Sequence, residues 1–108
     1  MSHRTARIVL TTIDSADAAQ RLAQVLVEQR LAACVNLLPG LTSIYRWQGA
    51  VETASEILLL IKTEEEQLPS LEAALHELHP YELPEFLVLS IESGSELYLR
   101  WLHDSLMP

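Results

Sequence analysis

The apolar run from Ile57 to Ile61 constrains the fold of this chain more than any other stretch. It continues a segment that starts at Val51. Val51, Thr53 and Ser55 fall on one face of this segment and Glu52, Ala54 and Glu56 on the other, as expected of a strand with one wet face. At Ile57 the alternation stops. Such a strand is covered on both faces, but one layer of helices covers only one. In a chain of 108 residues, we expect the second cover to come from another copy of the chain.

A long hairpin is predicted around Gln48-Gly49, because extended segments precede and follow this pair and glycine accepts the positive φ of a tight turn. Its first strand begins within 31–38, is interrupted at Pro39-Gly40 and continues to Trp47. Since proline cannot donate to a strand ladder, the interruption predicts a bulge or bend on an edge strand.

The other segments complete a βαββαβ order with a terminal helix. Residues 8–13 predict a central strand, and Ser15 caps an amphipathic helix that runs to about Arg30. Thr63 to Glu66 matches a capping box and predicts the start of a second helix, which Pro80 ends.

Residues 86–91 predict a buried strand, and Ser95 caps a last helix with one apolar side made of Leu97, Tyr98, Trp101 and Leu102. Two right-handed strand-helix-strand units give a four-stranded antiparallel sheet with the first and third strands central and both main helices on one face. The predicted fold is an α+β ferredoxin-like sandwich, in a single domain over residues 1–108.

Charge and composition exclude several classes of function. A formal charge of -8 with seven scattered basic residues argues against nucleic acid as a partner. No run approaches the roughly 20 apolar residues of a membrane helix, so the 49% apolar content points to subunit contacts. The one cysteine, Cys34, fits a reducing cytoplasm. Neither a Ser-His-Asp order nor a phosphate-binding glycine loop is present, so we expect no enzymatic activity.

The densest group of chemically capable side chains lies in a loop held extended by two prolines, and comprises His79, Tyr81, Glu82 and Glu85. Imidazole and carboxylate groups bind divalent metals, so His79, Glu82 and Glu85 are candidate ligands for copper or zinc. The alternative is that this group caps the helix and forms hydrogen bonds across a subunit interface.

Cys34, Lys62 and Tyr81 are candidate contacts for a bound small molecule. Cys34 is either a thiolate ligand or a small buried apolar residue. Lys62 ends the central strand, where it either pairs with Glu82 or Glu85 or binds an anionic ligand. Near the hairpin tip, two aromatic residues either line a pocket or pack between subunits, namely Tyr45 and Trp47.

Six pieces of the chain, in order, resemble the signature of the CutA family of divalent-cation tolerance proteins: 33–36, Pro39-Gly40, 43–49, Lys62-Thr63, 79–85 and 98–101. The resemblance implies a ferredoxin-like fold, a tight homotrimer and a link to copper and other divalent metals. It also implies a similarity of architecture to the PII-type signalling trimers, which bind small ligands between subunits.

The chain departs from the family's copper-binding pattern, which has a cysteine at the end of the first strand and two histidines before Pro-Tyr. Thr11 and Leu78 stand at two of these positions, which leaves only His79. Copper favours imidazole and thiolate, so any site here should bind a borderline or hard divalent ion, and weakly.

The leading hypothesis is a cytoplasmic, homotrimeric, non-enzymatic protein of divalent metal tolerance, with an inter-subunit cleft near the candidate residues Cys34, Lys62, His79, Tyr81, Glu82 and Glu85. One alternative is a PII-like sensor of a small anionic metabolite, which would contact Lys62 or Arg46. Another is a trimeric scaffold in which the polar cluster is wholly structural.

Overall fold

The computed structural model describes residues 5–108, so the first four residues of the predicted domain lie outside the described part. The elements occur in the predicted order: β1 (Ala6–Ile13), α1 (Ala16–Glu28), β2 (Cys34–Trp47), β3 (Ala50–Glu64), η2 (Glu65–Gln67), α2 (Leu68–Leu78), β4 (Leu87–Ser90) and α3 (Glu96–Leu106). None of the helices formed by these residues is long and apolar enough to cross a membrane.

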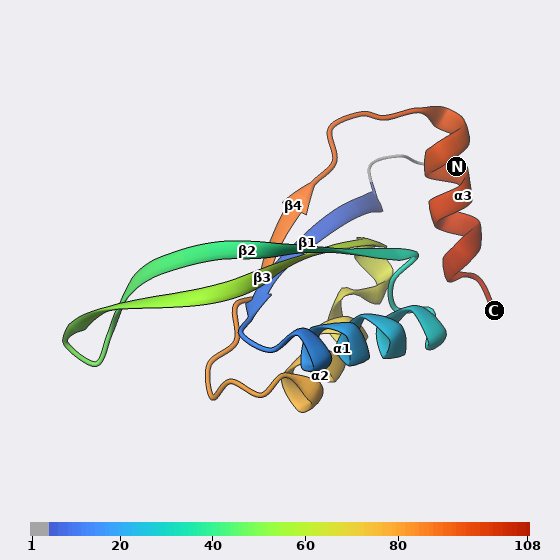
Figure 1. Cartoon of the computed structure of the whole chain (residues 1–108). Coiled ribbons are helices and arrows are strands. Elements are labelled where there is room, and N and C mark those ends of the chain that lie inside the picture. The colour runs from blue at the N-terminus through green and yellow to red at the C-terminus, as the bar shows by residue number, and fades with distance from the viewer. Residues whose placement is uncertain (1–4) are drawn as a thin grey trace.

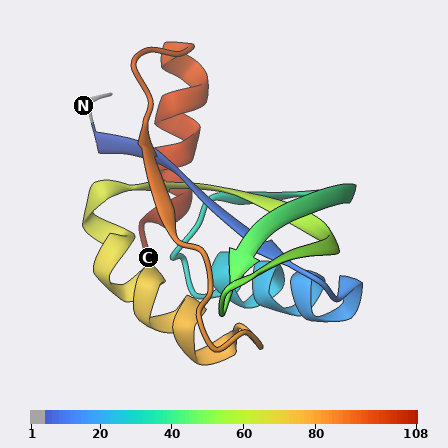
Figure 2. The same cartoon turned by 90° about the vertical axis from the view of Figure 1, so that its left-hand side faces the viewer.

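The four strands form one antiparallel sheet in the order β2-β3-β1-β4, so the first and third strands are central, as predicted. Helices α1 and α2 lie side by side on one face of the sheet (Figure 1). The view turned by 90° shows both helices below the sheet, with α3 upright behind β4 (Figure 2). The predicted α+β ferredoxin-like sandwich is therefore confirmed.

The core lies between the sheet and the two helices that cover it. Leu59 and Ile61 of β3 are fully buried there, against a cluster that also contains Val9, Ile13, Leu22, Leu26, Leu71 and Leu75. The intervening residues Leu58 and Leu60 point to the opposite face and are half-buried. The central strand is thus apolar on both faces, and only one of them is closed by α1 and α2.

The β2–β3 hairpin continues beyond the sheet as a two-stranded ribbon formed by residues 41–47 and 50–56, because β1 pairs with β3 only from Ile57 onward (Figure 1). Gln48 and Gly49, with φ of 50° and 84°, make the predicted turn. The register shifts between Leu38 and Leu41, which confirms the predicted bulge at Pro39-Gly40.

The predicted capping box at Thr63 is wrong. Strand β3 continues through Glu64, and Thr63 pairs with Arg7 of β1. The Thr63 hydroxyl donates to the carbonyl oxygen of Leu31 at 2.7 Å, while Glu64 Oε1 lies 2.8 Å from His103 Nδ1 of α3. Pairing with a distant strand therefore overrides the local capping preference, and α2 begins only at residue 68, with proline in its first turn.

The last strand and the last helix also differ from their predicted burial. In β4, Leu87, Val88 and Leu89 are between 41% and 55% exposed, since this strand lies at a sheet edge next to β1 alone. Helix α3 does begin after the predicted cap Ser95, but its buried side consists of Leu99, Leu102 and Leu106. The predicted side is mostly exposed, at Leu97, Tyr98 and Trp101, because α3 packs across the end of the sheet through its other stripe.

Two fully buried threonines on the helix-covered face of the central strands give a matched pair of mutations. Thr63 Oγ1 has the partner described above, whereas Thr11 Oγ1 has none within residues 5–108. We expect Thr63→Val to lower the free energy of unfolding by about 1–3 kcal/mol, because it leaves the Leu31 carbonyl unpaired. Thr11→Val should leave stability unchanged or raise it by up to about 2 kcal/mol, because it removes a hydroxyl that is buried without a partner.

Urea denaturation at one fixed protomer concentration measures both effects and avoids shifts caused by assembly. The exposed ribbon residue Thr53, changed to valine, serves as the control. Equal losses of stability in the Thr11 and Thr63 variants would contradict the assignment of the hydrogen bond.

Candidate functional site

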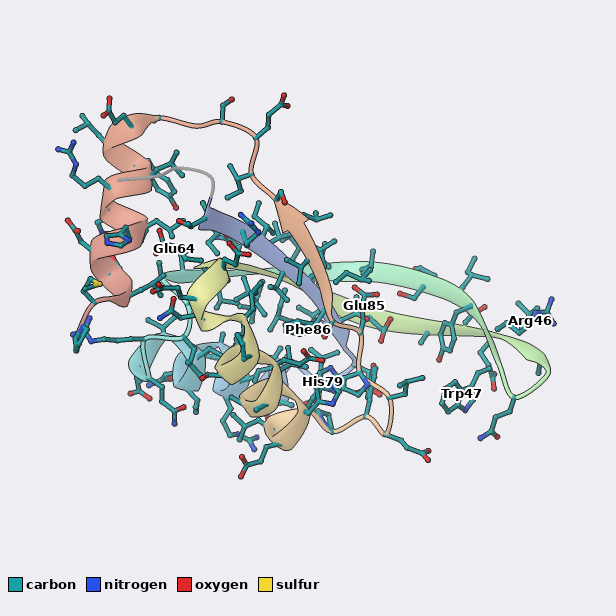
Figure 3. The ribbon with its side chains drawn as sticks, turned by 180° about the vertical axis from the view of Figure 1, so that it is seen from behind. Arg46, Trp47, Glu64, His79, Glu85 and Phe86 are labelled. Atoms are coloured by element: carbon teal, nitrogen blue, oxygen red, sulfur yellow. The ribbon has the colours of Figure 1, made fainter. Side chains whose placement is uncertain are left out.

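A cavity of about 620 Å³ lies between the ribbon and the loop of residues 79–86. Its lining combines three aromatic side chains, Tyr45, Trp47 and Tyr81, with four carboxylates, Asp14, Glu56, Glu82 and Glu85. Figure 3 shows Trp47 on the side of the ribbon that faces His79 and Glu85, whereas Arg46 points away near the ribbon tip. Part of the predicted site, from Tyr81 to Glu85, is therefore found beside the hairpin aromatics.

His79 attaches the loop to the sheet. It ends α2 in an extended conformation before Pro80, as predicted, and it is 5% exposed. The backbone N–H of Tyr81 donates to Nδ1 at 3.1 Å, so Nδ1 carries no proton, and Nε2 donates to the Thr12 carbonyl oxygen at 2.8 Å. Both ring nitrogens are thus engaged within the chain, and a metal could bind either one only if a hydrogen bond were broken.

Tyr81 connects the loop to the ribbon. Its hydroxyl donates to Glu56 Oε2 at 2.5 Å, and its ring packs edge-on against His79 with 4.6 Å between ring centroids. Glu56 is only 8% exposed. Burial, together with the hydrogen bond to the Glu56 carboxylate, raises the pKa of Tyr81 far above its usual range, so the hydroxyl stays a donor.

The cavity is strongly acidic. Burial, and then the neighbouring Glu56 carboxylate, raises the pKa of Glu85. No lysine, arginine or histidine contributes to the lining within the described residues 5–108. A concave surface that carries four carboxylates and no base attracts cations and repels anions.

Cys34 and Lys62 lie elsewhere. They face each other in the register of β2 and β3, six residues along β3 from Glu56, or about 20 Å at about 3.3 Å per residue. The Lys62 ammonium donates to the Tyr98 hydroxyl at 3.4 Å and lies 5.7 Å from the centre of its ring. Within one chain, Lys62 therefore lies apart from Glu82 and Glu85, and the predicted pairing stays a prediction that would involve a second chain.

Cys34 is half-buried, and its Sγ lies 3.8 Å from Asn36 Oδ1. Within one chain, the six predicted site residues thus form two separate groups. Cys34 and Lys62 lie near α3, while His79, Tyr81, Glu82 and Glu85 lie at the base of the ribbon. Contact between the groups would require more than one chain.

The prediction that His79, Glu82 and Glu85 bind a metal stays a prediction. Within residues 5–108, no group of three or more His, Cys, Asp or Glu side chains is arranged to hold an ion. Thr11, which stands at the position of the family's cysteine, is fully buried in the core. The accessible donors of the cavity are carboxylate and hydroxyl oxygens.

Glu56 and Asp14 were missed as site residues. Glu56 is the last polar residue before the apolar run that starts at Ile57, and a carboxylate at the entrance to a buried strand is a signal that could have identified it. Its pairing with Tyr81, 25 residues later, could not have been inferred from spacing.

Comparisons with known proteins agree with this fold. The profile of the family described as "CutA1 divalent ion tolerance protein" matches residues 7–105. The divalent-cation tolerance protein CutA of Thermus thermophilus is 50% identical over 98 residues, which are 91% of this chain and 95% of that protein. Protein CutA of Mus musculus is 46% identical over 86 residues, 80% of this chain but only 49% of that protein. A crystal structure of CutA from Xylella fastidiosa superposes with a TM-score of 0.93 at 40% identity, covering 95% of this chain and 99% of that one.

The hydrogen bond from Tyr81 to Glu56 predicts a loss of stability in Tyr81→Phe. The buried carboxylate would lose its only hydrogen-bond donor in the described chain, which costs about 1–3 kcal/mol. Chemical denaturation of this variant beside Tyr45→Phe, a change at a half-exposed ring of the same cavity, measures the effect. If both variants lose the same stability, the hydroxyl bond does not hold the loop to the ribbon.

Glu85 predicts a specific pH dependence of stability. Because its pKa in the folded chain lies above the ordinary 4.5, the folded state binds this proton more tightly than the unfolded state does. The stabilisation that results from this tighter proton binding is present at pH values below the ordinary pKa of Glu85. It is lost as the pH rises through the raised pKa of the folded chain. Glu85→Gln should therefore have a higher melting temperature than the parent near neutral pH, and the difference should shrink on acidification.

Thermal melts between about pH 4 and pH 8 test this expectation. Glu82→Gln is the matched control, because it removes the same charge at an exposed position of the same loop. A constant difference across this range would mean that Glu85 titrates alike in both states.

Proposed function

Because the chain belongs to the CutA1 family of divalent ion tolerance proteins, we propose that it is a non-enzymatic homotrimer that contributes to divalent cation tolerance by binding cations in its acidic cavity. The observation that carries the proposal is the lining itself, in which four carboxylates meet no basic side chain of the described residues. Such a site concentrates cations from solution through its electrostatic potential.

The donors of the cavity lack the groups that would select copper over other divalent ions. Copper prefers imidazole and thiolate ligands, whereas the side chains available here supply oxygen. His79 serves to fix the loop, and Glu82 and Glu85 supply the donors. With one or two carboxylates per ion and water in the other coordination positions, binding is weak.

Apolar surface that the single chain leaves uncovered supports the homotrimer. The edge strand β4 exposes three consecutive apolar residues, and the ribbon exposes Ile44 at 71% and Val51 at 64%. Unpaired sheet edges and contiguous apolar surface are features of subunit interfaces. A cytoplasmic location remains part of the proposal, supported by the single free thiol of Cys34.

The alternative of a PII-like sensor of an anionic metabolite has less support in this chain. Lys62, its predicted contact, is engaged with Tyr98 at the far end of β3. Arg46, the other predicted contact, points away from the cavity (Figure 3). An anion in the cavity would face four carboxylates.

Calorimetric titration of magnesium, manganese, zinc and copper ions into the purified protein tests the proposal. We expect weak binding of these ions without strong selectivity for copper, reduced at least tenfold in the double variant Glu82→Gln/Glu85→Gln. The control Glu28→Gln/Glu77→Gln removes the same charge from exposed helix positions and should bind like the parent. Equal binding by both double variants would place the ions outside the cavity.

Light scattering of the same samples tests the assembly. The trimer should have about three times the chain mass of 12.1 kDa. A monodisperse monomer at micromolar concentration would refute the proposed assembly.

A further inference from the structure

The size of the cavity exceeds what a metal ion needs. At about 620 Å³, it lies in the range of about 300–1,000 Å³ that is typical of small-molecule sites. Its carboxylates are spread over the wall, and no three of them in the described chain converge on one point. A bare ion could touch only one or two of these groups, whereas an organic molecule can extend between them.

The cavity also contains a buried charge without a counter-charge. Glu56 is 92% buried, and its one hydrogen-bond partner in the described chain is the neutral hydroxyl of Tyr81. Removing a carboxylate from water is unfavourable unless a cation or several donors compensate for the loss of hydration. A ligand that brings a positive charge next to Glu56 and Glu85 would supply this compensation.

Three aromatic rings determine which kind of cation fits. Tyr45 and Trp47 come from the ribbon and Tyr81 from the opposite loop, so the rings line the cavity from two sides. Trp47 is 37% and Tyr45 44% exposed, which leaves ring surface for a ligand to cover. Alkylated ammonium groups bind aromatic faces through cation–π attraction and apolar contact, whereas a metal ion that keeps its water shell gains little from them.

From these observations we infer that the cavity binds a small organic ammonium ion, held by the aromatic rings of Tyr45, Trp47 and Tyr81 and by the carboxylate of Glu56. This inference goes beyond cation tolerance, because it assigns a ligand class that uses the rings as well as the charge. It does not depend on the binding of divalent metals.

Trp47 provides a direct signal for the test. The chain has two tryptophans, so Trp101→Phe on α3 leaves Trp47 as the sole indole. In this otherwise intact trimeric protein, titration with choline should change the Trp47 fluorescence saturably. The probe 3,3-dimethyl-1-butanol has the same shape without the charge, and it should bind at least tenfold more weakly.

Variants in the Trp101→Phe background separate charge from ring contact. Glu56→Gln keeps an acceptor for the Tyr81 hydroxyl and should weaken choline binding at least tenfold, while Glu92→Gln, exposed in the loop before α3, should not. Trp47→Leu, in a chain that retains Trp101, removes one ring from the cavity lining and should reduce binding at least tenfold by calorimetry. It tests the inference even if Glu56→Gln does not fold.

Equal affinities for choline and its neutral analogue would overturn the inference, as would unchanged binding in Trp47→Leu. An absence of choline binding would also overturn it. Metal titrations distinguish the two proposals. Choline binding without metal binding would refute only the proposed function, and metal binding without choline binding would refute only this inference.

Discussion

The structure depends on unequal pairing along β3. On one side this strand pairs with β2 almost from end to end, but on the other side β1 reaches only to Ile57. Inside that limit the chain is a two-layer sandwich with an apolar core. Outside it, no further strand of residues 5–108 pairs with the ribbon, and the loop after α2 lies alongside. The cavity lies between the loop and the ribbon, which are joined by the hydrogen bond from Tyr81 to Glu56.

Sequence patterns predicted the elements because their causes are local. The turn at Gln48-Gly49, the bulge at Pro39-Gly40 and the helix end at Pro80 follow from the φ preferences and missing donors of single residues. The capping box at Thr63 failed, since β3 continues through Glu64 in register with β1, and Thr63 is paired with Arg7 there. Burial in β4 was mispredicted because its apolar pattern allows for neighbours that a single chain does not contain.

The candidate site was predictable only in part. The loop from His79 to Glu85 was conspicuous because it concentrates prolines, carboxylates and an imidazole in a few positions. What the sequence could not show is that both nitrogens of His79 are used within the chain, or that the loop's partner is Glu56 of the ribbon. Lys62 was grouped with the same site, yet the length of β3 places it beside α3. Local motifs indicated which residues have useful chemistry, and only the sheet register determined which of them meet.

The bulge at Pro39-Gly40 has a mechanical consequence. It interrupts the ladder between Leu38 and Leu41, close to the point where β1 ceases to support β3. The ribbon from there to the turn at Gln48 is about 25 Å long at about 3.4 Å per residue, so it acts as a lever with its pivot at the bulge. A bend of about 10° at the pivot would carry the tip through about 4 Å on that lever length, and Trp47, next to the turn, would move with it. Any bending at the bulge would therefore displace the wall of the cavity that carries Tyr45 and Trp47 more than the wall anchored by His79.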